Sequence, residues 1–268
     1  MSNHHLPEIY RVAMLATIEA TKVILPVYEG DIDPMIKGDG SPVTKADLAS
    51  SSVISSFLEP TGIPILGEEL EKDDFETRSK WTENWCVDPL DGTKMFLMKN
   101  DEFAINIAHV VDGKAVFGVI AEPMKSRMII GGPEYGAWIV QYEDMDSPEK
   151  WTKLNPVEST NSKLVVTCSR SFGVNQEQRL MESAGLTERD FEYLKKGSAL
   201  KFFDLSTGSA DMYPRFAPTM EWDIAAGQAI TEALGGTIIS LDDNQPLRYN
   251  KQSLYNPHFL ARTKAMSS

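Results

Sequence analysis

Two aspartates three positions apart, Asp88 and Asp91, directly follow a short apolar run with the composition of a buried strand. They belong to the segment Asp-Pro-Leu-Asp-Gly-Thr at 88–93, in which a turn at the proline would let both carboxylates converge beyond the strand end. Hard divalent cations such as Mg²⁺ prefer such oxygens in a near-octahedral arrangement, completed by the Leu90 carbonyl and by water. An ordinary turn uses the same residue types, whereas an EF-hand calcium loop would need alternating acids and a closing glutamate. The segment therefore predicts a magnesium site, with an ordinary turn as the alternative.

The residues that follow these aspartates suit a phosphate group. Gly92 lets the backbone approach a ligand closely because it has no side chain. If a helix begins near Thr93, its free N–H groups would form a cradle for an anion. A metal site and a phosphate cradle would then adjoin each other.

Three acids elsewhere in the chain are candidates to join this pair. Glu68 follows the apolar run 64–66, so it would lie at another strand end. Asp223 falls in the first turn of a predicted alanine-rich helix, where an acid alone would stabilise the helix dipole. Asp47 comes three residues after Thr44, which is the spacing of a helix capping box.

The periodicity of the first half predicts helices packed on a largely antiparallel sheet. An N-terminal helix is expected to end near Pro26, a polar loop to fill 29–40, and a second helix to cover 44–58. The pair Asp112-Gly113 is a strong two-residue hairpin signal. Strands are expected at 64–66, 85–87, 103–110, 115–120, 128–130 and 137–140.

The second half alternates strands and helices, as in α/β layering. Strands are expected at 164–167, 237–240 and 258–261, and helices at 174–184, 199–206 and 222–234. A polar stretch at 141–156 separates the halves, which predicts an α+β domain over 1–150 and an α/β domain over 151–268. The first would carry most of the candidate metal ligands, and the second would carry Asp223.

Composition excludes several classes of function. A net charge of -13 over 268 residues argues against a basic groove for a nucleic acid polymer. No apolar run approaches the roughly 20 residues of a transmembrane helix, and the N-terminus lacks signal-peptide features, so a cytoplasmic protein is expected. The two cysteines, Cys86 and Cys168, are too few for a disulfide framework or a thiolate zinc site. An acidic chain can still bind a phosphate ester where bound cations reverse the local field.

Three separated segments together resemble the signatures of the inositol monophosphatase superfamily: Gly-Glu-Glu at 67–69, the aspartate segment at 88–93, and Trp-Asp-Ile-Ala-Ala-Gly at 222–227. The resemblance covers nearly the whole chain. It implies a layered α/β/α/β/α sandwich and a magnesium-dependent, lithium-sensitive phosphatase with two or three Mg²⁺ per site.

The resemblance also implies a set of metal ligands. Glu68, Asp88 and the Leu90 carbonyl would hold one metal, while Asp88, Asp91 and Asp223 would hold a second. Asp88 would bridge the two ions. Metals in such a pair polarise the phosphoryl oxygens, activate water and stabilise the leaving oxygen.

The resemblance assigns catalytic roles to Asp47, Glu68 and Thr93. Asp47 would lie near a third, looser metal in addition to its capping role, and Thr93 with Glu68 would orient and deprotonate the attacking water. Direct in-line attack by water, without a phospho-enzyme, is the expected mechanism.

The second half is similar to one branch of the superfamily, the bacterial 3'(2'),5'-bisphosphate nucleotidases of sulfate assimilation, which convert adenosine 3',5'-bisphosphate to AMP. The resemblance lies in the segments 168–171, 197–202 and 213–216. Ser198 at a helix start, with Lys201 one turn later, could hold one phosphate, and Arg170 and Arg215 could bracket the phosphate that is kept. The predicted substrate-binding residues are Gly92, Thr93, Ser169, Arg170, Gly197, Ser198, Lys201, Arg215 and Asp223.

Two departures from this branch are Phe172, where many relatives have His, and Ala217, where they often have Gly. Two alternatives remain open: an inositol or sugar phosphate phosphatase with the same metal cluster, and a catalytically idle relative that binds metal or nucleotide. The partner is expected to be a small nucleotide bisphosphate, and the sequence gives no oligomeric state.

Overall fold

The structure is a computed structural model, and it describes residues 6–38, 40, 42–184 and 191–267. The helices are α1 (Glu8–Glu29), α2 (Lys45–Leu58), α3 (Phe75–Arg78), α4 (Thr93–Leu97), α5 (Val174–Ala184), α6 (Lys201–Thr207), α7 (Glu221–Ala233) and α8 (Lys264–Ser267). The strands are β1 (Met35–Ile36), β2 (Pro42–Val43), β3 (Ile65–Gly67), β4 (Glu83–Asp91), β5 (Ala104–Val111), β6 (Lys114–Glu122), β7 (Arg127–Gly132), β8 (Gly136–Gln141), β9 (Thr152–Leu154), β10 (Leu164–Cys168), β11 (Phe191–Lys195), β12 (Met212–Arg215), β13 (Thr237–Ser240) and β14 (Phe259–Arg262).

In the described residues, β3 to β9 form one sheet in the order of the sequence. Only the pair β3–β4 is parallel, and the other neighbours run antiparallel, as predicted for the first half. Asp112 and Gly113 join β5 to β6 with φ values of 49° and 72°. Both residues thus adopt the left-handed conformation that a two-residue type I′ hairpin requires. The predicted hairpin is confirmed.

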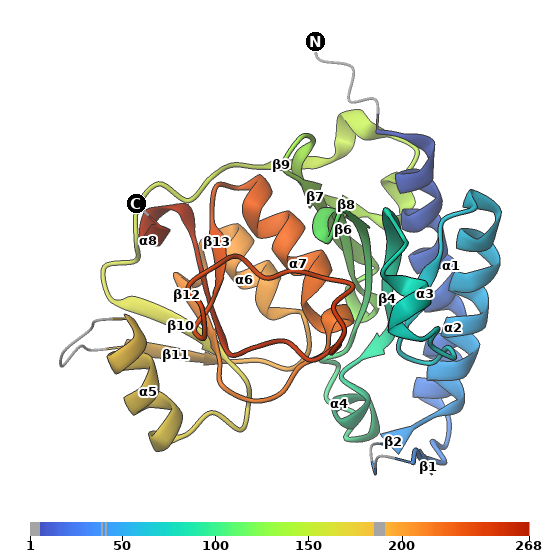
Figure 1. Cartoon of the computed structure of the whole chain (residues 1–268), viewed down its shortest axis with the longest axis horizontal. Coiled ribbons are helices and arrows are strands. Elements are labelled where there is room, and N and C mark those ends of the chain that lie inside the picture. Colours follow the sequence, from blue (N-terminus) through green and yellow to red (C-terminus); the bar gives the residue numbers. More distant parts are fainter. Residues whose placement is uncertain (1–5, 39, 41, 185–190, 268) are drawn as a thin grey trace.

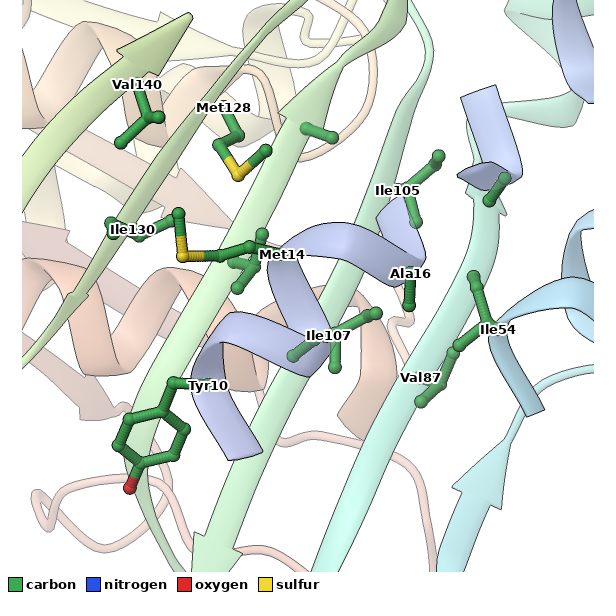
Figure 2. Close-up of a cluster of buried hydrophobic side chains, with 14 of the residues drawn as sticks. Tyr10, Met14, Ala16, Ile54, Val87, Ile105, Ile107, Met128, Ile130 and Val140 are labelled. Atoms are coloured by element: carbon green, nitrogen blue, oxygen red, sulfur yellow. The ribbon is translucent and has the colours of Figure 1, made fainter. Parts of the chain in front are cut away.

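The helices α1 and α2 cover one face of this sheet. Figure 2 shows the core between these helices and the strands. Met14 and Ala16 on α1 and Ile54 on α2 face Val87 and Ile107 on the strands, and all are buried. Successive side chains of each strand point to opposite faces of the sheet. One apolar face therefore packs against these helices, and the opposite face packs against α7. The sheet is therefore covered on both sides.

The second sheet has the order β11-β10-β12-β14-β13 within the part of the chain that is described. The helices α6 and α7 lie between the two sheets, and α5 lies beyond the second sheet (Figure 1), where Leu180 packs with Val166 and Cys168. The layers are thus helix, sheet, helix, sheet, helix, which confirms the predicted α/β/α/β/α sandwich.

Several predicted boundaries were wrong. β4 continues through the aspartate segment to Asp91, because a break in register between Asp88 and Asp91 places Pro89 where no ladder N–H is needed. The helix α1 runs past Pro26 to Glu29, since a proline removes only one hydrogen bond and Tyr28 is buried in the last turn. The short strand β1 lies inside the segment 29–40 that was predicted as loop.

Five strands of the described residues were not predicted: β1, β2, β9, β11 and β12. β9 pairs with β8, so the first sheet extends to Leu154.

None of the helices in the described part of the chain combines the length and apolar character that crossing a bilayer requires.

Candidate metal and phosphate site

A cluster of carboxylates lies where the bulged end of β4 meets the start of α7. Asp88, Asp91 and Asp223 each present an oxygen within 4.8 Å of the others. The sequence analysis predicted that a turn beyond the strand would bring the two aspartates together. Instead, a bulge within β4 turns them toward the same point. Asp223 comes from the first helical turn, where its Oδ2 accepts a hydrogen bond from the Met220 N–H at 2.9 Å. Residues 135 positions apart are thereby joined in one site.

The three carboxyl groups disfavour one another's charge. Burial, followed by the charges of Glu68, Asp91 and Asp223, raises the pKa of Asp88 well above its ordinary value. Burial and the neighbouring Asp91 raise the pKa of Asp223 to about 8. The pKa of Asp91 is also raised, mainly by burial. A divalent cation would relieve this repulsion, and all-oxygen donors suit Mg²⁺, so the residues fit the metal that the sequence predicts.

Asp91 is held in place by two donors. Its Oδ2 accepts hydrogen bonds from the Ala199 N–H at 2.5 Å and from the Asn106 side-chain amide at 3.3 Å. The sequence analysis missed Asn106, although a polar residue inside the apolar run of β5 was a signal that could have identified it. Asn106 is buried, and no described residue bonds to its Oδ1.

Thr93 and Asp47 form a hydrogen-bonded pair beside the cluster. The Thr93 hydroxyl donates to Asp47 Oδ1 at 3.0 Å, and it lies 3.4 Å from the Leu90 carbonyl. The other Asp47 oxygen accepts from the backbone N–H and hydroxyl of Thr44 at 2.7 and 2.6 Å, so the predicted capping box is present. Burial raises the pKa of Asp47 despite these donors. One carboxylate therefore both caps α2 and reaches Thr93.

Glu68 lies near the cluster but outside the group whose oxygens converge. Its Oε1 accepts a hydrogen bond from Lys37 at 2.8 Å, and Lys37 also binds Glu69 at 2.5 Å. Burial lowers the pKa of Lys37, but the hydrogen bonds that Lys37 donates to the two glutamates outweigh burial and raise the pKa. The sequence analysis gave no role to Lys37. A cavity of about 540 Å³ is lined by Lys37 and Glu68 on one side and by Asp223 on the other.

A second cavity, of about 270 Å³, is lined by Asp91 and Asp223, so Asp223 lines both cavities. Its described lining has two acidic side chains, Asp91 and Asp223, and more than twice as many basic ones. The basic lining residues are Lys94, Arg170, Lys196, Lys201 and Arg215. We call the two carboxylates the acidic floor of the cavity and the five basic side chains its basic walls. This combination suits a ligand with more than one phosphate that binds at a metal site.

Gly92 and Gly197 allow the walls to approach this floor. Gly92 has φ of 95°, and a Cβ there would lie 3.0 Å from the Glu102 carbonyl oxygen and 3.1 Å from Ser198 Cβ. A Cβ on Gly197 would lie 2.8 Å from Met95 Cγ. Both positions therefore require glycine for steric reasons.

Ser198 and Lys201 line the cavity as the sequence predicts, but Ser198 does not begin the helix. It has φ of 47°, and α6 begins only at Lys201. Lys201 is 3% exposed, and its Nζ donates to the Ser198 and Lys196 carbonyl oxygens at 2.5 and 3.3 Å. Burial lowers its pKa to about 8, although Asp91 opposes the shift. Lys201 thus supports the loop 196–198 from beneath.

The two predicted arginines also line the cavity. Arg215 donates to the Pro218 carbonyl at 3.2 Å, and its buried Nε has no partner among the described residues. Arg170 forms a bidentate ion pair with Glu102, which the sequence analysis did not identify. Ser169 lies 3.3 Å from the hydroxyl of Ser171, another lining residue.

Neither of the two departures lines the cavity, although the Phe172 N–H donates to the carbonyl oxygen of the lining residue Ser169 at 2.9 Å. Phe172 is buried in the small core of the second half, with its ring centroid 5.6 Å from that of Tyr193. Ala217 is half-buried and does not line the cavity.

Comparisons with known proteins identify the family and the fold of the chain. A family model described as the inositol monophosphatase family matches residues 5–266. The 3'(2'),5'-bisphosphate nucleotidase CysQ of Shigella flexneri is 36% identical over 245 residues, which cover 90% of this chain and 94% of the relative. The crystal structure of CysQ from Bacteroides thetaiotaomicron superposes with a TM-score of 0.80 at 36% identity, covering 94% of this chain and 96% of that one. The suppressor protein suhB of Bartonella henselae shares the fold at a TM-score of 0.76 and 20% identity, over 97% of this chain and 95% of that one.

Proposed function

The chain belongs to the inositol monophosphatase family, and we propose that it is a magnesium-dependent 3'(2'),5'-bisphosphate nucleotidase. It removes the 3'-phosphate of adenosine 3',5'-bisphosphate to give AMP and phosphate. The relatives at 30–36% identity that span most of the chain are named as 3'(2'),5'-bisphosphate nucleotidases, and this supports the assignment.

The observation that carries this proposal is the cavity that joins acidic floor to basic walls. A phosphate at the floor would meet the cluster of Asp88, Asp91 and Asp223, where bound cations make the field positive. A second phosphate on the same ligand would meet the arginines of the wall, since guanidinium groups bind phosphate oxygens in pairs. An inositol monophosphate has no second phosphate to use these arginines.

Two or three Mg²⁺ ions are proposed for the site. The residues that would hold them are Glu68, Asp88, the Leu90 carbonyl, Asp91 and Asp223, with Asp47 next to the third ion. When bound, these ions supply Lewis acidity to the phosphoryl oxygens and lower the pKa of water. Asn106 and the Ala199 N–H hold Asp91 for this task.

Thr93 and Asp47 are proposed to orient the attacking water. The Thr93 hydroxyl already donates to Asp47, so its oxygen lone pairs are left to accept a hydrogen from water. As the water attacks in line, the bond from phosphorus to the 3'-oxygen breaks. The proton of the attacking water passes to Thr93 Oγ1 while the Thr93 proton passes to Asp47 Oδ1, and the leaving 3'-oxygen takes a proton from solvent water to give the alcohol. The raised pKa of Asp47 makes it a better proton acceptor than an ordinary aspartate. The sequence analysis paired Thr93 with Glu68 for this task, but the Thr93 hydroxyl bonds to Asp47 whereas Glu68 bonds to Lys37, so Asp47 is proposed in place of Glu68.

The test is a side-by-side assay of phosphate release by the purified protein from adenosine 3',5'-bisphosphate and from inositol 1-phosphate. We expect a much higher kcat/KM for the nucleotide, full dependence on Mg²⁺, and loss of activity with EDTA that added Mg²⁺ restores. Faster hydrolysis of inositol 1-phosphate would support the alternative phosphatase. Binding of the nucleotide without release of phosphate would support the idle relative.

A further inference from the structure

We propose that Glu102 is a positioning residue that gives the site its preference for a nucleotide with a second phosphate. It acts by fixing the guanidinium of Arg170 at the wall of the phosphate cavity. This inference rests on the proposed function, because it concerns the phosphate that the enzyme keeps.

The first argument is the geometry of the Arg170–Glu102 pair. Arg170 Nε donates to Glu102 Oε2 at 2.8 Å, and Nη2 donates to Oε1 at 2.6 Å. This side-on pairing uses two of the five N–H donors of the guanidinium. No described residue bonds to the remaining edge, formed by Nη1 and the second hydrogen of Nη2, and Arg170 lines the cavity. That edge has the spacing that binds two phosphate oxygens.

The second argument is that Glu102 also holds Gly197, another residue that lines the cavity. Its Oε2 accepts a third hydrogen bond, from the Gly197 N–H at 2.8 Å. The loop between α4 and β5 is thereby tied to two separate segments of the second half, one after β10 and one before α6. Burial would raise the pKa of Glu102, but the hydrogen bonds from Arg170 and Gly197 outweigh it and lower the pKa. The carboxylate is therefore charged at neutral pH.

An exposed ion pair usually contributes little, but this one differs in its surroundings. The Glu102 side chain is 20% exposed and carries three charge-assisted hydrogen bonds, whereas Arg170 is 49% exposed and has no other partner among the described residues. A half-exposed arginine alone would sample many rotamers, and a ligand would have to immobilise it. With Glu102 present, that ordering has taken place before the ligand binds. The predicted effect is on binding of the second phosphate rather than on the chemical step.

The variant Glu102→Gln tests this step selectively. The amide oxygen can take the place of Oε2 and still accept from Gly197 and from Arg170 Nε. The amide NH₂ then replaces Oε1 and faces Nη2, donor against donor. The substitution therefore keeps the hydrogen bond from the Gly197 N–H and disturbs the hydrogen bond from Arg170 Nη2. A matched control is Asp146→Asn. The Asp146 carboxylate pairs with Arg11 at 2.6 Å, and neither residue lines the cavity.

The measurement is kcat and KM for two substrates, adenosine 3',5'-bisphosphate and adenosine 3'-monophosphate, which lacks the second phosphate. In Glu102→Gln we expect KM for the bisphosphate to rise about tenfold with kcat within twofold, and KM for the monophosphate to change by less than twofold. In an Arg170→Ala background, Glu102→Gln should change KM for the bisphosphate by less than twofold. Asp146→Asn should match the wild type.

The outcomes separate this inference from the proposed function. Equal effects on both substrates, a lower KM for the bisphosphate, or additive effects of the two substitutions would each overturn the role of Glu102 while the nucleotidase activity stands. A wild-type protein that hydrolyses neither nucleotide would overturn both proposals. Thermal melting of each variant shows whether it is folded. A second variant, Glu102→Asp, keeps the negative charge but has a shorter side chain that reaches less far toward Arg170. We expect Glu102→Asp to raise KM for the bisphosphate as well, with a normal KM for the monophosphate.

Discussion

Replacing Asp223 with asparagine should stabilise the metal-free protein and remove most of its response to Mg²⁺. The Asp223 carboxylate lies within 4.8 Å of Asp88 and Asp91, and this proximity together with burial opposes its charge. Asparagine has nearly the same shape and keeps an oxygen that can accept the Met220 N–H, which now bonds at 2.9 Å. The substitution therefore removes a charge without removing the helix cap.

The magnitude follows from the pKa of Asp223, which rises from an ordinary 3.8 to about 8 in the folded chain. Because the folded state binds the proton more tightly than the unfolded state, stability falls as the pH rises between these two values, by about 1.4 kcal/mol per pH unit. At pH 7 the sum is on the order of 4 kcal/mol. Part of the side chain faces water in the cavity, so we expect about half of this, roughly 2 kcal/mol.

The assay is urea unfolding, followed by tryptophan fluorescence, of EDTA-treated wild type and variant at pH 5 and pH 8, each repeated with millimolar Mg²⁺. Without metal, the variant should be the more stable protein at pH 8, and the difference should shrink at pH 5. With Mg²⁺ the wild type should gain stability and the variant should gain much less. Phosphate release by the variant should be lost.

A control in the same helical turn is Glu221→Gln. Glu221 is fully buried, but its carboxylate accepts from the Asn250 N–H at 2.6 Å, from the Lys251 N–H at 3.0 Å and from the Lys251 ammonium at 2.6 Å. Its loss should destabilise the protein by about 1–3 kcal/mol, the opposite sign. If metal-free Asp223→Asn were less stable than the wild type at pH 8, the argument from carboxylate repulsion would be refuted.

Three further predictions concern single residues. Asp91→Asn should lower phosphate release at least 100-fold while far-UV circular dichroism stays native, and near wild-type rates would remove Asp91 from the metal cluster. Thr93→Val keeps the shape but removes the hydroxyl that donates to Asp47, so kcat should fall about 10²- to 10⁴-fold with KM nearly unchanged in steady-state kinetics; an unaltered kcat would exclude the proposed proton path. Gly118→Ala would place a Cβ 2.3 Å from the Ala226 carbonyl oxygen, so α7 must move off the sheet, and urea unfolding should show a loss of about 3 kcal/mol. An unchanged urea midpoint would show that α7 packs less closely.

The sequence was sufficient for features that depend on local chemistry. The hairpin at Asp112-Gly113 and the capping box of Thr44 and Asp47 follow from the conformations that these few residues favour, and both are present. The sandwich fold was predicted from linked motifs rather than from periodicity alone. Periodicity missed β11 and β12, because β11 contains the charged residues Glu192 and Lys195 and β12 contains Pro214, which are residue types that count against a strand.

Residue types and spacing also indicated acids that could bind metal. The family resemblance pointed to three of the basic residues that line the cavity, Arg170, Lys201 and Arg215, but not to Lys94 or Lys196. Only the tertiary structure decided how these side chains are held. The bulge in β4, the hydrogen bond between Asn106 and Asp91, and the pairing of Glu102 with Arg170 join residues far apart in sequence. A single sequence contains no record of such contacts, because their energies arise from the distance between groups after folding.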